Sequence, residues 1–119
     1  MALDISNRNP EYYENRFEQR YKMACKCMVQ IDGEQFNGEI ADISFNGVAF
    51  ILEHYWGQDI VGEVIEFCIF RENYMAVTMI GELRNYTVTP DNHTRLGLQI
   101  KRGNRQVWDA LVRQAQNGL

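Results

Sequence analysis

The feature that most constrains the fold of this chain is a series of short apolar runs separated by tight-turn residues. Asp32-Gly33 and Asn46-Gly47 are the clearest turns, and a Pro-Asp-Asn break lies at residues 90–92. Asp-Gly and Asn-Gly pairs favour short hairpin connections, because these residues accept the backbone angles that such turns require. The pattern therefore predicts successive antiparallel strands at residues 22–31, 35–43, 48–52, 62–70, 75–89 and 95–100.

The apolar residues of the later runs show which faces should be buried. Val77, Met79 and Leu83 fall on one side of the fifth run, and Leu96, Leu98 and Ile100 recur on one side of the sixth. Residues 103–117 then change to helical spacing, with Asn104 as the expected N-cap. The apolar stripe of this helix is expected to contain Val107, Trp108, Leu111, Val112 and Ala115. We expect a mainly β fold, a six-stranded antiparallel β-barrel with one C-terminal α-helix.

The N-terminal region is expected to be a leader followed by a short helix or arm. Residues 1–8 are mostly polar, and Asn9, Pro10 and Glu11 form a helix-start pattern that predicts a helix at residues 10–17. At 119 residues and 45% apolar content, residues 1–119 are expected to form a single domain. Its expected parts are a flexible leader at 1–8, an arm at 9–21, the barrel at 22–101 and the helix at 103–117.

The charge and the cysteines narrow the classes of function. Twelve basic and 16 acidic residues give a net charge of -4, which argues against a protein that binds a long nucleic-acid polymer. The N-terminus shows no secretory pattern and no apolar stretch is long enough for a membrane helix, so we expect a cytoplasmic protein without membrane insertion. Cys25, Cys27 and Cys68 form no metal-binding or redox spacing, so reduced thiols and no metal site are expected.

Catalysis is not expected. Ser6 and Ser44 are the two serines of the chain, and neither falls in a pattern with His and an acid that suggests a triad. The glycines are scattered among the turns instead of forming a phosphate-binding or dinucleotide-binding loop. The sequence thus favours a binding or interaction domain that needs no cofactor.

Two short motifs indicate which ligand such a domain would bind. Residues 16–20 read RFEQR and residues 42–47 read DISFNG, which give Arg-x-x-x-Arg followed by Asp-x-Ser-x-x-Gly. In this order and separation they resemble the two signature segments of the PilZ domain, the bacterial receptor module for cyclic di-GMP. The resemblance extends over about residues 14 to 116, because residues 95–100 resemble the late strand of that family. It implies a β-barrel followed by a helix, with cyclic di-GMP as the ligand.

The chemistry of guanine explains why these residue types suit the ligand. Guanine presents N7 and O6 on one edge, which a planar guanidinium such as that of Arg16 or Arg20 can meet with two hydrogen bonds. The other edge carries N1–H and the amino group, which the carboxylate of Asp42 can accept. Ser44 can donate to a phosphate or to a base acceptor. Gly47 is expected to give the turn its backbone freedom and to leave room for the nucleotide.

Two further positions complete the predicted ligand-binding set. Asn46 belongs to the same loop as Ser44. Asn15 precedes the first arginine, a position that in the family influences whether one ligand or an intercalated pair binds; the pair is favoured by arginine, so Asn15 favours one ligand per chain.

Other readings of these residues remain open. Arg16 and Arg20 could be surface arginines paired with Glu18 or Glu14, and Asp42 and Ser44 could cap their own turn.

At the level of function, the first hypothesis is a receptor whose arm becomes ordered when cyclic di-GMP binds. The receptor would then signal to an unidentified protein effector in motility, pilus or exopolysaccharide control. A PilZ-like interaction module that binds no nucleotide is the alternative. A third is an OB-like binder of single-stranded nucleic acid through aromatic residues: Tyr12, Tyr13, Phe17 and Tyr21.

Overall fold

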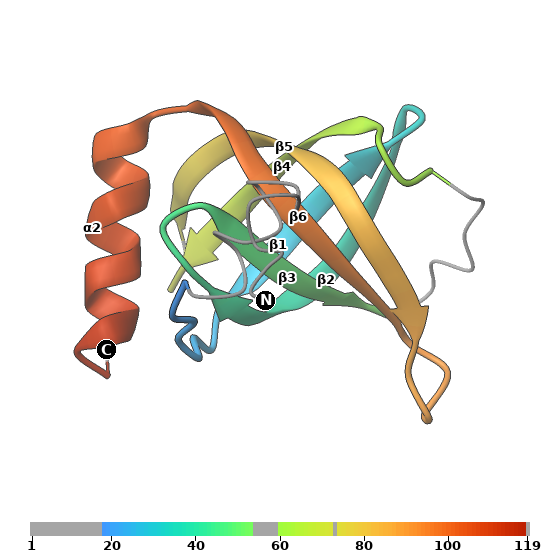
Figure 1. Cartoon of the computed structure of the whole chain (residues 1–119), viewed down its shortest axis with the longest axis horizontal. Coiled ribbons are helices and arrows are strands. Elements are labelled where there is room, and N and C mark those ends of the chain that lie inside the picture. The colour runs from blue at the N-terminus through green and yellow to red at the C-terminus, as the bar shows by residue number, and fades with distance from the viewer. Residues whose placement is uncertain (1–17, 54–59, 73, 119) are drawn as a thin grey trace, which may run out of the picture.

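The structure is a computed structural model that describes residues 18–53, 60–72 and 74–118. Six antiparallel strands close into a barrel, and a helix lies beside one end of it (Figure 1). The elements are β1 (Lys26–Ile31), β2 (Glu34–Ile43), β3 (Gly47–Leu52), β4 (Val64–Arg71), β5 (Tyr74–Val88), β6 (Thr94–Gly103) and α2 (Arg105–Gln116). The six-stranded antiparallel barrel with a C-terminal helix is thereby confirmed. The leader and the helix expected at residues 10–17 lie outside the described residues.

Closure of the barrel depends on two pairings between strands that are distant in sequence. The strand order is β1-β2-β3-β6-β5-β4, and β4 pairs with β1 to complete the circle. The first strand begins at Lys26, four residues later than the sequence suggests. Before it, Tyr21 forms an isolated antiparallel bridge with Ile43 at the end of β2. This bridge brings the residues that precede the barrel alongside β2.

The β1–β2 turn follows the local chemistry of its two residues. Asp32 has φ of 52° and Gly33 has φ of 83°. Positive φ at both central residues is the requirement of a type I′ turn, which matches the twist of the two strands that it joins. The Asp32-Gly33 prediction is therefore confirmed.

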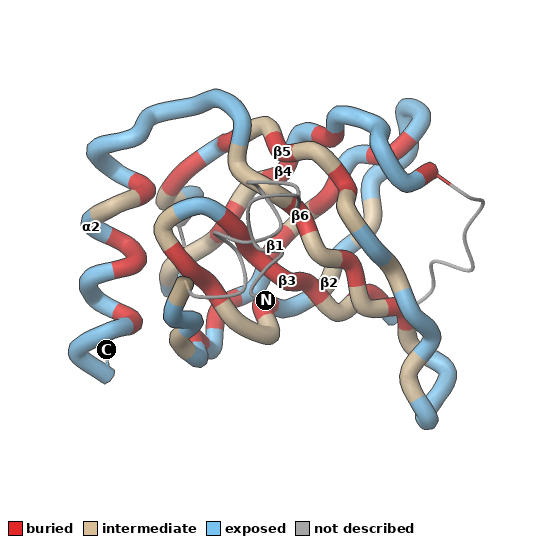
Figure 2. Tube along the Cα trace, in the orientation of Figure 1, coloured by how far each residue is buried: buried red, intermediate tan, exposed pale blue. Residues whose placement is uncertain are grey.

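Buried and more exposed residues alternate along much of β1, β4 and β6, whereas most of β3 is buried (Figure 2). The predicted inward faces of β5 and β6 are confirmed for Val77, Met79, Leu83, Leu96 and Leu98, and Ile100 is partly buried against the same core. In the centre, the rings of Phe50 and Phe67 pack edge to face, with 4.9 Å between their centroids. Such aromatic pairs add specific geometry to a large buried apolar area.

Helix α2 packs against the barrel through four buried residues: Trp108, Leu111, Val112 and Ala115. Asn104 caps it as predicted, because its side chain accepts a hydrogen bond from the Val107 N–H. The side chain of Val107 is 36% exposed, so its predicted place in the buried stripe is wrong. Trp108 is fully buried, and its ring lies 5.9 Å from that of Phe67. The helix thus attaches to the interior of the barrel through one large side chain.

The cysteines are free thiols: Cys25 and Cys27 are buried, and Cys68 is half-buried. Burial, reinforced by the negative charge of Glu39, raises the pKa of Cys27 to about 12. Within the described ranges, no helix is long and apolar enough to span a membrane.

Replacing Trp108 by Ala should lower the free energy of unfolding by about 3–5 kcal/mol, as expected when a large buried aromatic residue leaves a cavity. The change also removes the donor that bonds the Ser44 carbonyl. Chemical denaturation checks this. Val107→Ala, one position away on an exposed side chain, should stay within about 0.5 kcal/mol of the parent. A loss below about 1 kcal/mol for Trp108→Ala would contradict the role assigned to this side chain.

Thiol labelling should distinguish Cys68 from Cys27. The thiolate is the reactive form, and a pKa raised from 9.0 to about 12 makes it about a thousandfold scarcer at Cys27. In the native protein, mass spectrometry should find Cys68 modified first and Cys27 last, whereas denaturant should make all three react alike. Cys68→Ser should remove the fast phase. Equal rates at Cys27 and Cys68 in the folded protein would refute this assignment.

Candidate functional site

The predicted ligand-binding residues gather on the outer face of β2, β3 and β6. Asp42 pairs in register with Ala49, and Ala49 pairs with Gly97. Because neighbouring residues of a strand point to opposite faces, these three lie outside the barrel while Val48 and Leu98 point into its core. On this face Ala49 is buried, with 2% of its surface exposed, and the Asn85 side chain lies over Gly97, where a Cβ would approach its Oδ1 to 2.7 Å.

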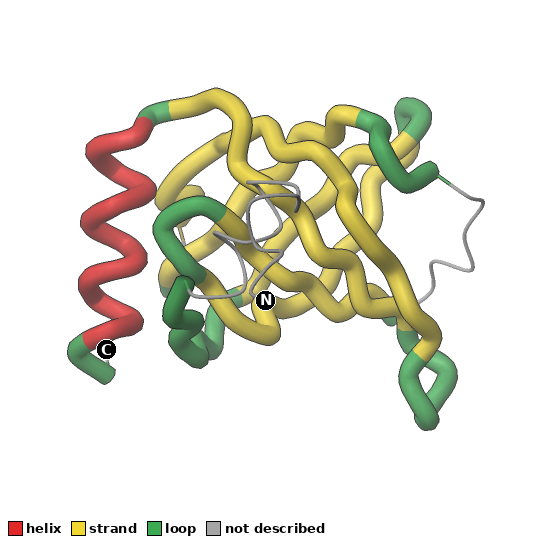
Figure 3. The backbone as a smooth tube through the Cα atoms, in the orientation of Figure 1, coloured by secondary structure: helices red, strands yellow, loops and turns green. Residues whose placement is uncertain are grey.

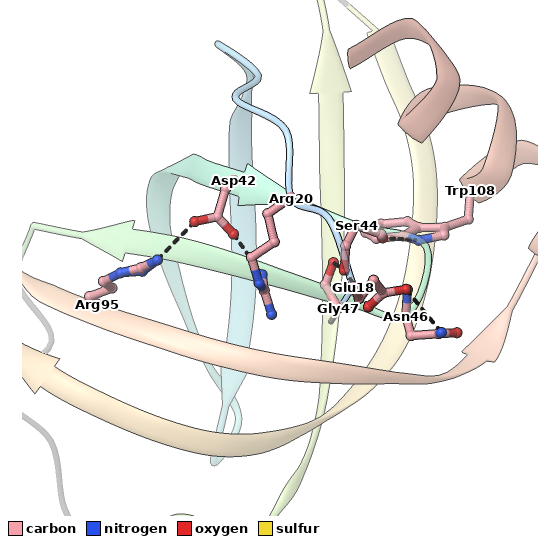
Figure 4. Close-up of polar contacts among 8 residues, drawn as sticks. All are labelled: Glu18, Arg20, Asp42, Ser44, Asn46, Gly47, Arg95 and Trp108. Atoms are coloured by element: carbon pink, nitrogen blue, oxygen red, sulfur yellow. Dashed lines mark hydrogen bonds and ion pairs between the residues drawn. The ribbon is translucent and has the colours of Figure 1, made fainter. Parts of the chain in front are cut away.

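Asp42 holds two arginines that come from opposite directions (Figure 4). Its Oδ1 lies 2.6 Å from Arg20 Nη1, and its Oδ2 lies 2.9 Å from Arg95 Nη2. The Asp42 side chain is 15% exposed, whereas each arginine side chain is 37% exposed. A carboxylate has about four acceptor positions, so each oxygen can still accept a further hydrogen bond.

Arg20 owes its position to the bridge formed by the next residue. The Tyr21 N–H donates to Ile43 O at 2.8 Å, and the Ile43 N–H donates to Tyr21 O at 2.9 Å. These two bonds fix the end of the arm antiparallel to the end of β2. Arg20 is thereby placed beside Asp42, the residue that precedes Ile43.

Gly47 begins β3 where Arg20 crosses the loop. A Cβ at this position would lie 3.1 Å from Arg20 Nη2 and 3.1 Å from Leu98 O. Gly47 is not among the described glycines with positive φ. The expectation that it supplies backbone freedom is therefore wrong. Its second expected role, room for the nucleotide, stays a prediction; in the structure the Arg20 guanidinium lies at this position.

The turn from Ser44 to Gly47 is closed by the Ser44 N–H, which donates to Gly47 O at 2.9 Å. Ser44 is fully buried, and its Oγ lies 2.9 Å from Glu18 Oε1 and 3.3 Å from Gly47 O. A hydroxyl has one proton to donate. Since Gly47 O already accepts the backbone N–H, the shorter contact to Glu18 is the better acceptor for that proton.

Glu18 also binds the next exposed residue of the loop. Its Oε2 accepts from the Asn46 backbone N–H and from Asn46 Nδ2, both at 3.0 Å. The carboxylate of Glu18 therefore receives three hydrogen bonds from the Ser44–Asn46 loop, as the contacts in Figure 4 show. Charge-assisted bonds of this kind are stronger than bonds between neutral groups.

Helix α2 contacts the same loop, which lies at its end of the barrel (Figure 3). The Trp108 indole N–H donates to Ser44 O at 3.1 Å. Arg105 donates through Nη2 to Phe45 O and to Asn46 Oδ1, the latter at 3.2 Å. The loop that carries the second motif is thus held by the arm and by the helix.

The structure brings together five of the predicted site residues: Arg20, Asp42, Ser44, Asn46 and Gly47. Arg16 and Asn15 lie outside the described residues, so their roles stay predictions. The reading of Arg20 as a surface partner of Glu18 is wrong, because Arg20 pairs with Asp42. Ser44 closes its own turn through its backbone N–H, while its hydroxyl, which one alternative assigned to that turn, has its shorter contact to Glu18.

Sequence reasoning missed three contributors to this site. Glu18 was considered only as a possible surface partner of the arm arginines, Arg95 only as part of a strand, and Arg105 not at all. An acidic residue inside an arginine motif was a signal that a donor group should face it, but nothing identified the donors. Of the four aromatics considered for nucleic-acid stacking, Tyr21 alone is described, and it packs partly buried against the core.

The site offers positively charged hydrogen-bond donors and negatively charged acceptors side by side. Among the described side chains, no group of three His, Cys, Asp or Glu residues could hold a metal ion. Its chemistry is that of recognition: guanidinium groups for acceptor edges or phosphates, and a carboxylate for donor edges.

Comparison with known proteins agrees with this geometry. The PilZ domain matches residues 14–116. No curated protein sequence matches the chain. Similar solved structures include MotI (DgrA), the inhibitor of motility of Bacillus subtilis, with 17% identity and a TM-score of 0.71 over 87% of this chain and 50% of that one.

Two structures described with cyclic di-GMP are also similar. The PilZ domain of YcgR from Escherichia coli has 12% identity and a TM-score of 0.70, and the match covers 87% of this chain and 92% of that domain. MrkH of K. pneumonia has 15% identity and a TM-score of 0.71 over 87% of this chain and 53% of that one. The chain spans about half the length of MotI and MrkH. At these identities the structures show a shared fold, and the match over residues 14–116 shows that the chain belongs to the PilZ domain family.

Proposed function

We propose that this protein is a receptor for cyclic di-GMP and not an enzyme. The observation that carries the proposal is the meeting of the two motif segments: Arg20 of the arm lies 2.6 Å from Asp42 and passes over Gly47. Segments more than 20 residues apart thus form one surface. Structures of YcgR and MrkH, which share the fold, are described with cyclic di-GMP.

The site has complementary groups for both edges of guanine. Arg20 supplies two parallel N–H donors for N7 and O6, and Asp42 supplies acceptors for N1–H and the amino group. These features favour a guanine base over adenine, whose edge presents a different order of donors and acceptors.

The local charge suits a dianionic ligand despite the net charge of -4. Arg20 and Arg95 share one carboxylate, Asp42, and so carry one positive charge more than it offsets, which the Glu18 carboxylate in the neighbouring loop balances. Arg16 is proposed to add a second arm arginine. Phosphate oxygens would compete with Asp42 for these guanidinium groups.

Ligand binding is proposed to change the surface offered to a protein effector. Because residues 18–21 already lie on the barrel, the change at the arm would be a new pairing of Arg20 and Asp42 rather than their first docking. Trp108 and Arg105 connect the same loop to α2, so the helix is the proposed output element. The expected setting is the cytoplasm, with control of motility, pili or exopolysaccharide as the output.

Calorimetric titration with cyclic di-GMP, cyclic di-AMP and GTP tests the proposal. Cyclic di-GMP should bind most tightly. Arg20→Ala should weaken its binding about five- to 150-fold, because losing a bidentate guanine contact costs about 1–3 kcal/mol. The molar ratio should be one ligand per chain, as predicted from Asn15.

Arg71→Ala is the matched control, since Arg71 lies on β4, which is opposite β3 in the ring of strands. It should change the affinity less than about twofold, provided that thermal unfolding shows a folded protein. A folded protein that gives neither heat nor a thermal shift with cyclic di-GMP would instead favour the alternative, an interaction module that binds no nucleotide.

Asp42→Asn should reduce the preference for guanine over adenine. A hydrogen bond to a charged group contributes about 1.5–3 kcal/mol, so the ratio of the two affinities should fall about 10-fold or more. Asp32→Asn provides the control, because Asp32 lies in the β1–β2 turn with φ of 52°, a conformation that Asn also accepts. An unchanged affinity ratio in Asp42→Asn would remove this carboxylate from base recognition.

A further inference from the structure

We propose that Glu18 is an internal competitor of the ligand: its carboxylate occupies hydrogen-bond donors that an acceptor group of cyclic di-GMP must use. This inference rests on the proposed function and concerns the same site. It assigns to Glu18, which lies between the two arginines of the arm motif, the task of limiting affinity.

The contacts of Glu18 are those of a bound anion. One oxygen accepts from Ser44 Oγ at 2.9 Å, and the other accepts from the Asn46 N–H and Nδ2, each at 3.0 Å. A loop that directs a backbone N–H, an amide and a hydroxyl at two carboxylate oxygens is equally able to receive phosphate oxygens or a base acceptor.

Without Glu18, the hydrogen-bond donors of Ser44 and Asn46 would have poorer acceptors within the protein. If Glu18 leaves, the Ser44 hydroxyl can turn to Gly47 O at 3.3 Å, which already accepts the Ser44 N–H. Asn46 is exposed, so its N–H and Nδ2 would face the solvent or a ligand. Departure of Glu18 therefore frees donors at the place where Arg20 crosses Gly47.

The position of Glu18 also opposes the ligand by charge. Ser44 lies within 3.4 Å of the Cβ position of Gly47, and Arg20 Nη2 lies 3.1 Å from the same point, so a phosphate held by Arg20 would approach the Glu18 carboxylate. Like charges at such distances repel, and a partly buried setting screens them less than bulk water does. Glu18 must be displaced before the ligand can use the loop.

The expected size of the effect follows from the fraction of molecules in which the donors are free. The apparent dissociation constant equals the intrinsic constant divided by that fraction. If Glu18 occupies the loop in about nine-tenths of the molecules, the affinity is reduced about tenfold. Removing the Glu18 charge should recover most of that factor.

A supporting role for Glu18 predicts the opposite sign. If the three hydrogen bonds served to hold the arm so that Arg20 faces the ligand, their loss would weaken binding. Competition predicts tighter binding. The sign of the change in affinity therefore separates the two roles.

The test is calorimetric titration of the whole chain with cyclic di-GMP for the parent, Glu18→Gln and Glu18→Ala. Competition predicts binding about three- to 30-fold tighter in both variants. Glu66→Gln makes the same change of net charge on an exposed residue of β4, across the barrel from β3, and should stay within about twofold of the parent.

The outcomes distinguish this inference from the function on which it rests. If the parent binds cyclic di-GMP and both Glu18 variants bind it with equal or lower affinity, the competitor role is overturned and the receptor function stays intact. An equal gain in Glu66→Gln also overturns it, because the effect would then be one of net charge. Absence of binding in the parent and in every variant, with folded proteins, overturns the receptor function and the inference together.

Discussion

The buried turn at Ser44 is the point on which the arrangement of this protein depends. Every polar group of Ser44 has a partner in a different part of the molecule: its N–H bonds to Gly47 O, its carbonyl to Trp108 and its hydroxyl to Glu18. Because a buried polar group without a partner is costly, these bonds hold together the arm, the barrel and the helix. The residue that the motif places in ligand recognition thus also supports the fold.

The charged groups of the site are partners of one another. Asp42 lies between Arg20 and Arg95, and Glu18 covers the donors of the neighbouring loop. Under the proposed function, binding is an exchange in which ligand groups replace these internal partners. The affinity then reflects a difference between two sets of contacts, so the side chains that are displaced matter as much as those that bind the ligand.

Local chemistry was readable from the sequence, and distant pairing was not. The Asp32-Gly33 pair predicted the β1–β2 turn, and the alternation of apolar residues identified the inner faces of β5 and β6. The turn and the strand faces depend on residues that are neighbours in the sequence. Helical spacing showed that α2 has an apolar stripe, but it did not show that Val107, at the border of this stripe, is exposed. The partners of Glu18 lie 26 and 28 residues away, and Arg95 lies 53 residues from Asp42. Those contacts exist only once the strands are arranged in the barrel. The motif resemblance predicted which residues lie together at the site, but it did not reveal the hydrogen bonds and ion pairs that these residues make within the protein.

The closed barrel limits how a protein partner can recognise this domain. Each of the six strands is hydrogen-bonded to two neighbours over most of its length, and the edge that remains at residues 74–78 of β5, which pair with β4 but not with β6, is short. Recognition over the rest of the ring must therefore depend on side chains, whose pattern differs from one face to another, instead of on backbone groups that any extended peptide could match. Under the proposed function, a protein effector would then be selected by surface chemistry, and a few substitutions on one face would redirect the protein to a different effector without disturbing its architecture.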